Sequence, residues 1–245
     1  VIEETQAPQG YRLNPETAVI TVAPDGRGEH DCIVRFPSGK DVAAGLTIRE
    51  HVMRGGVCVA KTDAELNEPA AVGGNEDIAW APSLAGVQFE IANASASSVR
   101  IGDTWYEPGQ TVGMIETQWD EDRQGFYART APDALPFGTY EIREIAASNG
   151  YLLADGSAQT VEIRTEGELV ETTIDDGKLA FSNQVMRNDL ELTKIRDGDG
   201  QPLQVAFSLT SLATGEQHVL VCDENGKAST ASGFAKHTVN TNGND

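Results

Sequence analysis

The stretch Val57-Cys58-Val59-Ala60-Lys61 follows the two-residue period of a β-strand and places Val57, Val59 and Lys61 on one face. A second stretch, Leu190-Glu191-Leu192-Thr193-Lys194, has the same period and also ends in a lysine. Both stretches predict strands whose apolar face terminates in a lysine.

Short strands separated by turns are predicted along the rest of the chain. Six further segments alternate in the same way, at 87–91, 139–145, 159–164, 179–182, 205–210 and 218–222. Turn dipeptides separate them, namely Pro108-Gly109, Asp176-Gly177, Asp199-Gly200 and Asn225-Gly226. Long helical periodicity is scarce, so the pattern indicates an all-β fold of the sandwich type.

An internal repeat orders these strands. Segments 4–11 and 144–151 share Glu, Ala, Gly and Tyr in register, 140 residues apart. The tripeptide Val-Met-Arg occurs at 52–54 and at 185–187, and in both copies a lysine follows the arginine by seven residues. The two signatures recur in the same order, which predicts repeated structural modules.

The repeat places module boundaries near Gly55 and Asn188. Residues 1–54 are then the C-terminal part of a truncated module, and residues 55–187 form a complete one. Residues 188–245 are the N-terminal part of a further truncated module. The chain is interpreted as an excerpt of a longer polypeptide, with any signal and anchor outside it.

Five motifs occur among these strands, namely an opening strand with lysine and aspartate at 59–63, Gly-Val-x-Phe at 86–89, Gly-x-Tyr running into glutamate at 138–144, Ala-Pro-x-Gly-Tyr at 7–11 and Phe-x-Asn at 181–183. In this combination they resemble the Cna-B-type, SpaA-like modules of Gram-positive surface proteins and pilins. The resemblance implies tandem prealbumin-like (Ig-like) β-sandwich modules. The complete module is longer than a minimal one, with an insertion expected at about 93–133.

The resemblance also implies a self-formed crosslink. Lysine, glutamate and asparagine at these positions often form an intramolecular isopeptide bond in the family, which implies Lys61 and Asn183 as the crosslinked pair and Glu144 as the proton shuttle. Burial disfavours the ammonium form of lysine and leaves a nucleophilic amine. The alternative is an ordinary Lys61–Glu144 ion pair beside a strand asparagine.

The two truncated modules depart from this pattern. Glu50 falls where the first module would need an asparagine, so no bond is expected there although Glu4 is retained. The third module has Lys194 but lacks its glutamate and asparagine within this chain.

The leading functional hypothesis is a structural spacer or stalk in an extracellular, cell-wall-anchored surface protein or pilin, with neighbouring modules as partners. The alternative is an adhesin module that binds host glycoprotein or matrix through the aromatic-rich insertion. Its possible ligand surface comprises Trp105, Tyr106, Trp119 and Tyr127. Packing of these aromatics in the core of a hairpin is the competing interpretation. A hydrolase with paired carboxylates has no specific signature here.

Composition excludes several other classes. The chain has 18 Lys+Arg against 38 Asp+Glu, a net charge of -20, which opposes binding to nucleic acid or to an anionic membrane. Cys32, Cys58 and Cys222 lie far apart without a metal-binding spacing, so neither a metal nor a cofactor is expected. Residues 197–200 are interpreted as a hairpin turn and residues 120–122 as a solvated acidic turn.

Overall fold

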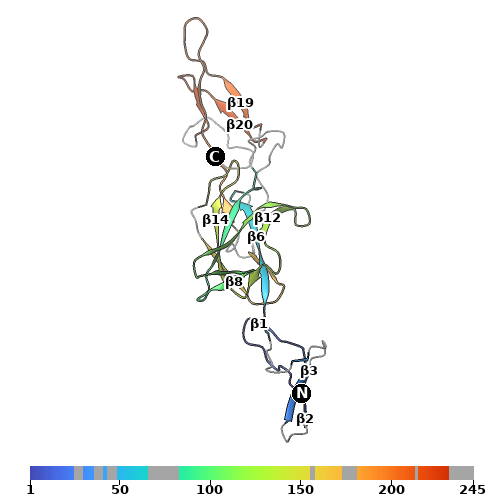
Figure 1. The fold of residues 1–245 in the computed structure, drawn as a ribbon. Helices are drawn as coiled ribbons and strands as arrows, with labels where there is room; N and C mark the ends of the chain where they lie inside the picture. The colour runs from blue at the N-terminus through green and yellow to red at the C-terminus, as the bar shows by residue number, and fades with distance from the viewer. Residues whose placement is uncertain are drawn as a thin grey trace.

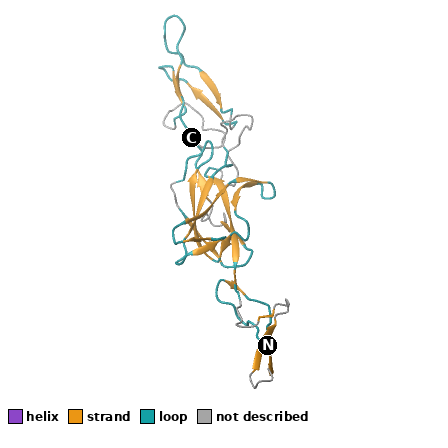
Figure 2. Cartoon of the chain, viewed as in Figure 1, coloured by secondary structure: helices purple, strands orange, loops and turns teal. Residues whose placement is uncertain are grey.

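The computed structural model describes residues 1–24, 30–35, 41–42, 49–65, 83–154, 158–172, 181–212 and 215–231. Within these ranges the chain forms strands joined by turns and loops, with no helix, as Figure 2 shows. Three groups of strands follow one another along the long axis of an extended molecule, and small sheets lie on either side of a larger two-sheet part (Figure 1). The prediction of an all-β chain is therefore confirmed.

We call the two-sheet part, from β6 to β17, the body. The strands that precede it are β1 (Tyr11–Arg12), β2 (Val19–Pro24), β3 (His30–Arg35), β4 (Asp41–Val42) and β5 (His51–Val52). The strands of the body are β6 (Arg54–Asp63), β7 (Gln88–Asn93), β8 (Val99–Ile101), β9 (Thr104–Tyr106), β10 (Thr111–Glu116), β11 (Gln118–Asp120), β12 (Gly125–Arg129), β13 (Leu135–Pro136), β14 (Gly138–Ala146), β15 (Gln159–Ile163), β16 (Leu169–Thr172) and β17 (Phe181–Asn183). The strands that follow it are β18 (Glu191–Thr193), β19 (Ala206–Thr210), β20 (Gln217–Val221) and β21 (Lys227–Ser229).

Each strand segment predicted from the sequence overlaps one of these strands, with residues 179–180 outside the described ranges. The turns at Pro108-Gly109 and Asn225-Gly226 are also confirmed, whereas Asp176-Gly177 lies outside the described residues. At 197–200 the chain turns back so that Ile195 pairs with Pro202, as expected for a hairpin turn.

The body consists of two sheets that enclose one apolar core. One sheet has the order β10-β7-β14-β15, and the other has six strands with β6 at its centre. Both sheets contribute to the core, whose buried members include Val57, Val59, Phe89, Ile91, Tyr140, Ile142, Val161, Ile163 and Phe181. Side chains from two facing sheets that interdigitate in this way define a β-sandwich.

Strand β6 is buried along almost its whole length, from Gly55 to Asp63. The alternating pattern at 57–61 predicts one buried face, but the outer face is covered as well. Arg123, in the turn between β11 and β12, donates from Nη1 to the Sγ of Cys58 at 3.4 Å and pairs with Glu171 on β16 at 2.5 Å. The long arginine side chain therefore shields the outer face of the central strand.

The segment 93–133, which the sequence predicts to be an insertion, contributes strands to both sheets of the body. Its strand β10 pairs with β7 in one sheet, and its strand β12 pairs with β6 in the other. The β8–β9 hairpin forms a separate two-stranded sheet. The segment thus builds both faces of the body, and the hairpin is the part of it that lies outside the two main sheets.

The repeated signatures adopt the same local geometry in both copies. In the first copy the Gly-Tyr segment 10–11 pairs with the Val-Met segment 52–53, and Tyr11 lies opposite Val52. In the second copy segment 150–151 pairs with segment 185–186 in the same way, and Tyr151 lies opposite Val185. The methionine amide donates to the glycine carbonyl at 2.8 Å in the first copy and at 2.7 Å in the second. The sequence repeat therefore corresponds to a repeated backbone arrangement.

Candidate functional site

The first and last strands of the body lie side by side. β17 runs parallel to β6, with Phe181 opposite Lys61 and Asn183 opposite Asp63. Neighbouring strands are about 4.8 Å apart, and residues two positions apart share a face. Lys61 and Asn183 therefore project from adjacent strands toward the same interior.

Glu144, on β14 of the opposite sheet, contacts both of these side chains. The Nζ of Lys61 donates to Glu144 Oε2 at 2.8 Å, and the Nδ2 of Asn183 donates to Glu144 Oε1 at 2.5 Å. The exposed fractions of Lys61, Glu144 and Asn183 are 0%, 3% and 1%. The structure thus brings the three residues selected from the sequence to one buried point.

The surroundings of this point are apolar. The rings of Phe181 and Phe89 meet edge to face with their centroids 4.8 Å apart, and Val59 is fully buried on the same face of β6 as Lys61. Burial lowers the pKa of Lys61, while its hydrogen bond to Glu144 and the negative charge there oppose that shift. Lys61 consequently loses its proton more readily than an exposed lysine does.

The amide of Asn183 presents its nitrogen to Glu144. The carboxyl accepts a hydrogen bond from the Nδ2 group. The Oδ1 atom of Asn183 is buried without a hydrogen-bond partner among the described residues. A buried acceptor left unpaired costs about 1–3 kcal/mol, so this arrangement of the amide is not a fully satisfied resting state.

Sequence reasoning missed a second buried polar pair beside the site. The hydroxyl of Tyr151 donates to Asp63 Oδ2 at 2.5 Å, and both residues are buried. Tyr151 belongs to the repeated Gly-Tyr signature and Asp63 to the opening strand motif, but no local pattern links residues 88 positions apart. The only hint in the sequence was that Tyr151 recurs at the end of the repeated signature, which marks it as a structurally important residue.

The possible ligand surface is divided between two places. Trp105 and Tyr106 lie on β9 of the hairpin, near the Arg54 end of β6, where Arg54 donates to the carbonyl of Arg100 at 3.2 Å. Trp119 and Tyr127 lie on β11 and β12, near the Lys61 end of β6. The two ends are about 23 Å apart along an extended strand, so a ligand that contacts all four aromatics would have to extend along the sheet.

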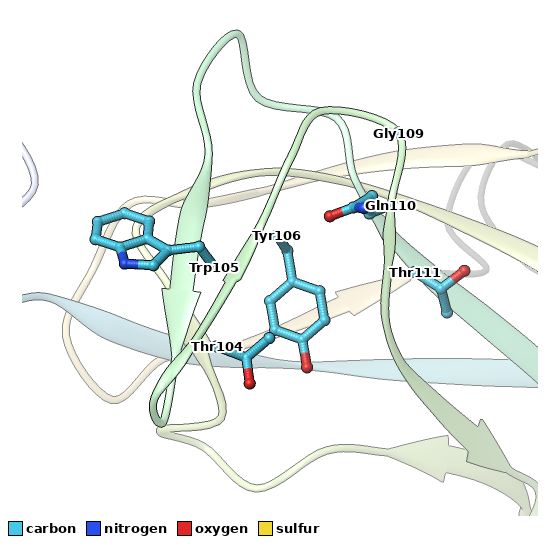
Figure 3. Close-up of a pocket in the computed structure, with 6 residues that line it drawn as sticks. All are labelled: Thr104, Trp105, Tyr106, Gly109, Gln110 and Thr111. Carbon is cyan, nitrogen blue, oxygen red and sulfur yellow. The ribbon is translucent and has the colours of Figure 1, made fainter.

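The aromatic side chains also differ in exposure. Trp105 is 62% exposed, so core packing of a hairpin does not describe it, whereas Tyr106 packs against the main core. Figure 3 shows Trp105 projecting from β9 away from Thr104 and Tyr106. Together with Gln110 and Thr111, these residues line a hollow of about 470 Å³. Trp119 is exposed on one side and meets Phe126 edge to face at 5.2 Å.

Several smaller expectations have definite outcomes. Asp120 is buried and pairs with Arg129 at 3.2 Å, so it is not a solvated acidic residue. Asn93, at the end of β7, is buried and donates to two backbone carbonyls at 3.0 Å. Cys58 and Cys222 are both buried, and Cys32 is among the residues whose side chains are not described.

Neither a metal cluster nor a membrane-spanning helix is found in the described part of the chain. No group of three or more His, Cys, Asp or Glu there is arranged to hold a metal ion. No helix there is long and apolar enough to cross a membrane.

Among the described residues, those expected to belong to truncated modules form no arrangement like the one around Glu144. Glu4 accepts a hydrogen bond from the amide of Asn14 at 2.7 Å, and Glu50 Oε2 is buried without a partner among the described residues. Lys194 is exposed.

Comparison with known proteins confirms the family resemblance. Residues 77–178 match the family model of the SpaA prealbumin-like fold domain. The structure of the Bacillus anthracis TIE protein has a TM-score of 0.54 and 21% identity, with 97% of this chain and 37% of that chain covered. The fold is thus an all-β, prealbumin-like sandwich.

Two pilin structures are more distant. The group B streptococcus pilus 2b backbone protein has a TM-score of 0.32 and 16% identity, with 64% of this chain and 49% of that chain covered. The major pilin SpaD from Corynebacterium diphtheriae has a TM-score of 0.32 and 14% identity, with 69% of this chain and 37% of that chain covered. The chain therefore spans less than half the length of each of these three structures. No curated protein matches it.

Proposed function

We propose that this chain is a structural shaft segment of a Gram-positive surface protein or pilin, whose body is closed by a self-formed isopeptide bond between Lys61 and Asn183. The observation that carries the proposal is the buried Glu144 carboxyl, which contacts the lysine and the asparagine at the same time. A bond there would join the first strand of the body to its last. The body would then resist being pulled apart from its ends.

The reaction begins with proton transfer inside the buried pair. Moving one proton from Lys61 Nζ to Glu144 converts the ion pair into a neutral amine and a neutral acid, which an apolar site favours. If the amide of Asn183 turns so that Oδ1 and Nδ2 exchange places, the protonated Glu144 donates to Oδ1. This hydrogen bond would satisfy the unpaired oxygen and polarise the carbonyl.

The bond then forms with loss of ammonia. The lone pair of Lys61 Nζ attacks Cγ of Asn183, and a C–N bond forms as the Cγ–Nδ2 bond breaks. Glu144 supplies a proton to the departing Nδ2 and accepts one from Nζ. Packing holds the reacting groups next to each other, so the reaction is intramolecular and needs no collision between separate molecules. Each molecule reacts once.

We further propose the modular organisation that the repeat indicates. Residues 1–54 belong to a preceding module, residues 55–187 form the complete one, and residues 188–245 begin the next. The repeated backbone contacts of the Gly-Tyr and Val-Met segments support this division. The partners are then the neighbouring modules, and the location is the outer surface of a cell wall to which the longer protein is anchored.

The mass of the intact protein tests the bond. The 245-residue chain is expected to be lighter than its sequence by one ammonia, whereas Glu144→Gln keeps the full mass. Glu141→Gln is the matched control, because Glu141 lies on the same strand but is only half-buried and pairs with Arg143. Proteolysis should yield a branched peptide that joins residues 61 and 183. Full mass in the parent chain would refute the crosslink and leave an ordinary buried ion pair.

A second candidate function is favoured by the exposed Trp105. A large exposed aromatic beside amide and hydroxyl groups is suited to stacking on a sugar ring or contacting a peptide. An adhesin role predicts binding to host glycoprotein or matrix that Trp105→Ala abolishes and Trp119→Ala leaves intact. Binding that is equal in both variants would exclude the hairpin as the contact.

A further inference from the structure

Tyr151 links the strand that holds Lys61 to the chain that follows Glu144. Its hydroxyl donates to Asp63 Oδ2 at 2.5 Å, and Asp63 lies two residues beyond Lys61 on the same face of β6. Tyr151 itself follows Glu144 by seven residues in the same chain segment. The hydrogen bond from the phenol therefore connects the chain that follows β14 to the C-terminal end of β6.

The backbone of the same residue binds the chain just beyond Asn183. Tyr151 pairs with Val185, two residues after Asn183, and the amide of Leu152 donates to the carbonyl of Gln184 at 2.9 Å. One short segment, 150–152, thus contacts the ends of both β6 and β17. These are the strands whose side chains must meet.

Asp63 is held in a defined orientation. Its Oδ2 accepts from the Tyr151 hydroxyl, and its Oδ1 accepts from the amide of Glu65 at 2.7 Å. Asp63 is fully buried and lies opposite Asn183 in the register of β6 and β17. A carboxylate in that position would compete with Glu144 for Lys61 and Asn183 if it were free to turn toward them.

We propose that the Tyr151–Asp63 hydrogen bond is a positioning pair for isopeptide formation, which holds the two strand ends in register and directs Asp63 away from the reacting groups. The inference rests on the proposed crosslink. In this role the pair takes no part in making or breaking bonds and acts through the placement of Lys61 and Asn183. A misplacement of about 1 Å is enough to slow a reaction on the order of 100-fold, so loss of the pair is expected to slow crosslinking at least tenfold.

The rate of mass loss in freshly made protein tests this role. The full chain is synthesised in a cell-free system, synthesis is stopped, and the fraction that has lost ammonia is followed by intact mass. Tyr151→Phe should react at least tenfold more slowly than the parent. Tyr140→Phe is the matched control, because Tyr140 is also fully buried and also donates its hydroxyl, to the carbonyl of Pro136 at 2.8 Å. Both variants lose a buried hydrogen bond, so a general loss of stability would slow both alike.

Substitutions of Asp63 give an independent reading. Asp63→Asn keeps a partner for the phenol, since its amide nitrogen can donate to the Tyr151 oxygen while its carbonyl accepts from Glu65. It should react at close to the parent rate, whereas Asp63→Ala should be as slow as Tyr151→Phe. The comparison of these two Asp63 variants tests the positioning role even if Tyr151→Phe does not fold.

The outcomes separate this inference from the proposed function. Equal rates in Tyr151→Phe and Tyr140→Phe, or in Asp63→Ala and the parent, would overturn the positioning role while leaving the crosslink intact. A parent chain that never loses ammonia would refute the crosslink and the positioning role together.

Discussion

Lys61 is fully buried, and desolvation lowers its pKa below the ordinary value of 10.5 despite the neighbouring Glu144. A lysine with a lowered pKa binds its proton more weakly in the folded chain than in the unfolded one. Its contribution to stability is therefore fully present above pH 10.5 and is lost as the pH falls through the lowered folded value. The unreacted protein should show this dependence directly.

Asn183→Ala provides that unreacted protein, because it removes the acceptor and leaves the Lys61–Glu144 pair in place. The free energy of unfolding in urea is measured for Asn183→Ala and for Asn183→Ala with Lys61→Met. The advantage of the methionine variant should grow as the pH falls below 10.5. A difference that stays constant with pH would mean that Lys61 binds its proton equally well in both states.

The central strand β6 depends on two glycines at its start. A Cβ on Gly56 would collide with the carbonyl oxygen of Ala131, and one on Gly55 would lie 2.8 Å from the carbonyl oxygen of Glu168. Backbone atoms of neighbouring segments cannot move aside as the end of a flexible side chain can. The close approach of these segments therefore requires residues without side chains.

Gly56→Ala should lower the free energy of unfolding by about 1–3 kcal/mol, as overpacking of a tight interior does. The measurement is urea unfolding in the Asn183→Ala background, so that no crosslink holds the strand in place. Gly113→Ala is the control, because a Cβ at that position on β10 meets no atom within 4 Å. Equal stability in the two variants would show that the neighbouring backbone yields easily.

The strands show how far the sequence alone leads. Alternation located β6, β7 and β14, because each has one apolar face against the core, and the repeat together with the family resemblance selected Lys61, Glu144 and Asn183. The outer cover of β6 was not predictable, since it comes from an arginine 65 residues away from Cys58. The contact between Tyr151 and Asp63 was missed for the same reason. Pairings of side chains across the fold depend on the packing of sheets and leave no local period.

For the body as a unit, the proposed crosslink closes the loop between residues 61 and 183. By analogy with disulfides, a closed loop of this length stabilises by about 5 kcal/mol, chiefly by restricting the unfolded chain. The parent should therefore unfold at a higher urea concentration than Glu144→Gln, with Glu141→Gln matching the parent. Equal midpoints in a parent whose crosslink has been verified by mass would show that strain in the folded body offsets the loop-closure gain.

The junction beyond the body is held by ion pairs centred on Arg187. The guanidinium lies 2.6 Å from Glu65 of the loop after β6 and 2.9 Å from Glu216, just before β20, and hydrogen bonds to both acids raise its pKa. Both carboxylates are largely shielded from solvent. Without the arginine they would face each other in a chain whose net charge is already -20, and like charges at short range repel.

Arg187→Ala should therefore loosen the connection between the body and the strands that follow it. Hydrogen exchange of the backbone amides at 186–190 is expected to accelerate, while the amides of β6 keep their protection, because the body does not depend on this contact. Arg196→Ala is the control, since Arg196 and its partner Asp199 are both exposed to solvent, and such an ion pair should contribute almost nothing to stability. Arg187→Lys should restore only part of the protection, because a lysine cannot bridge two carboxylates with the planar fork of a guanidinium. If exchange at 186–190 is unchanged in Arg187→Ala, the junction is held by backbone contacts such as the bond from the Met186 amide to the Gly150 carbonyl, and the charges there do not determine how readily it opens.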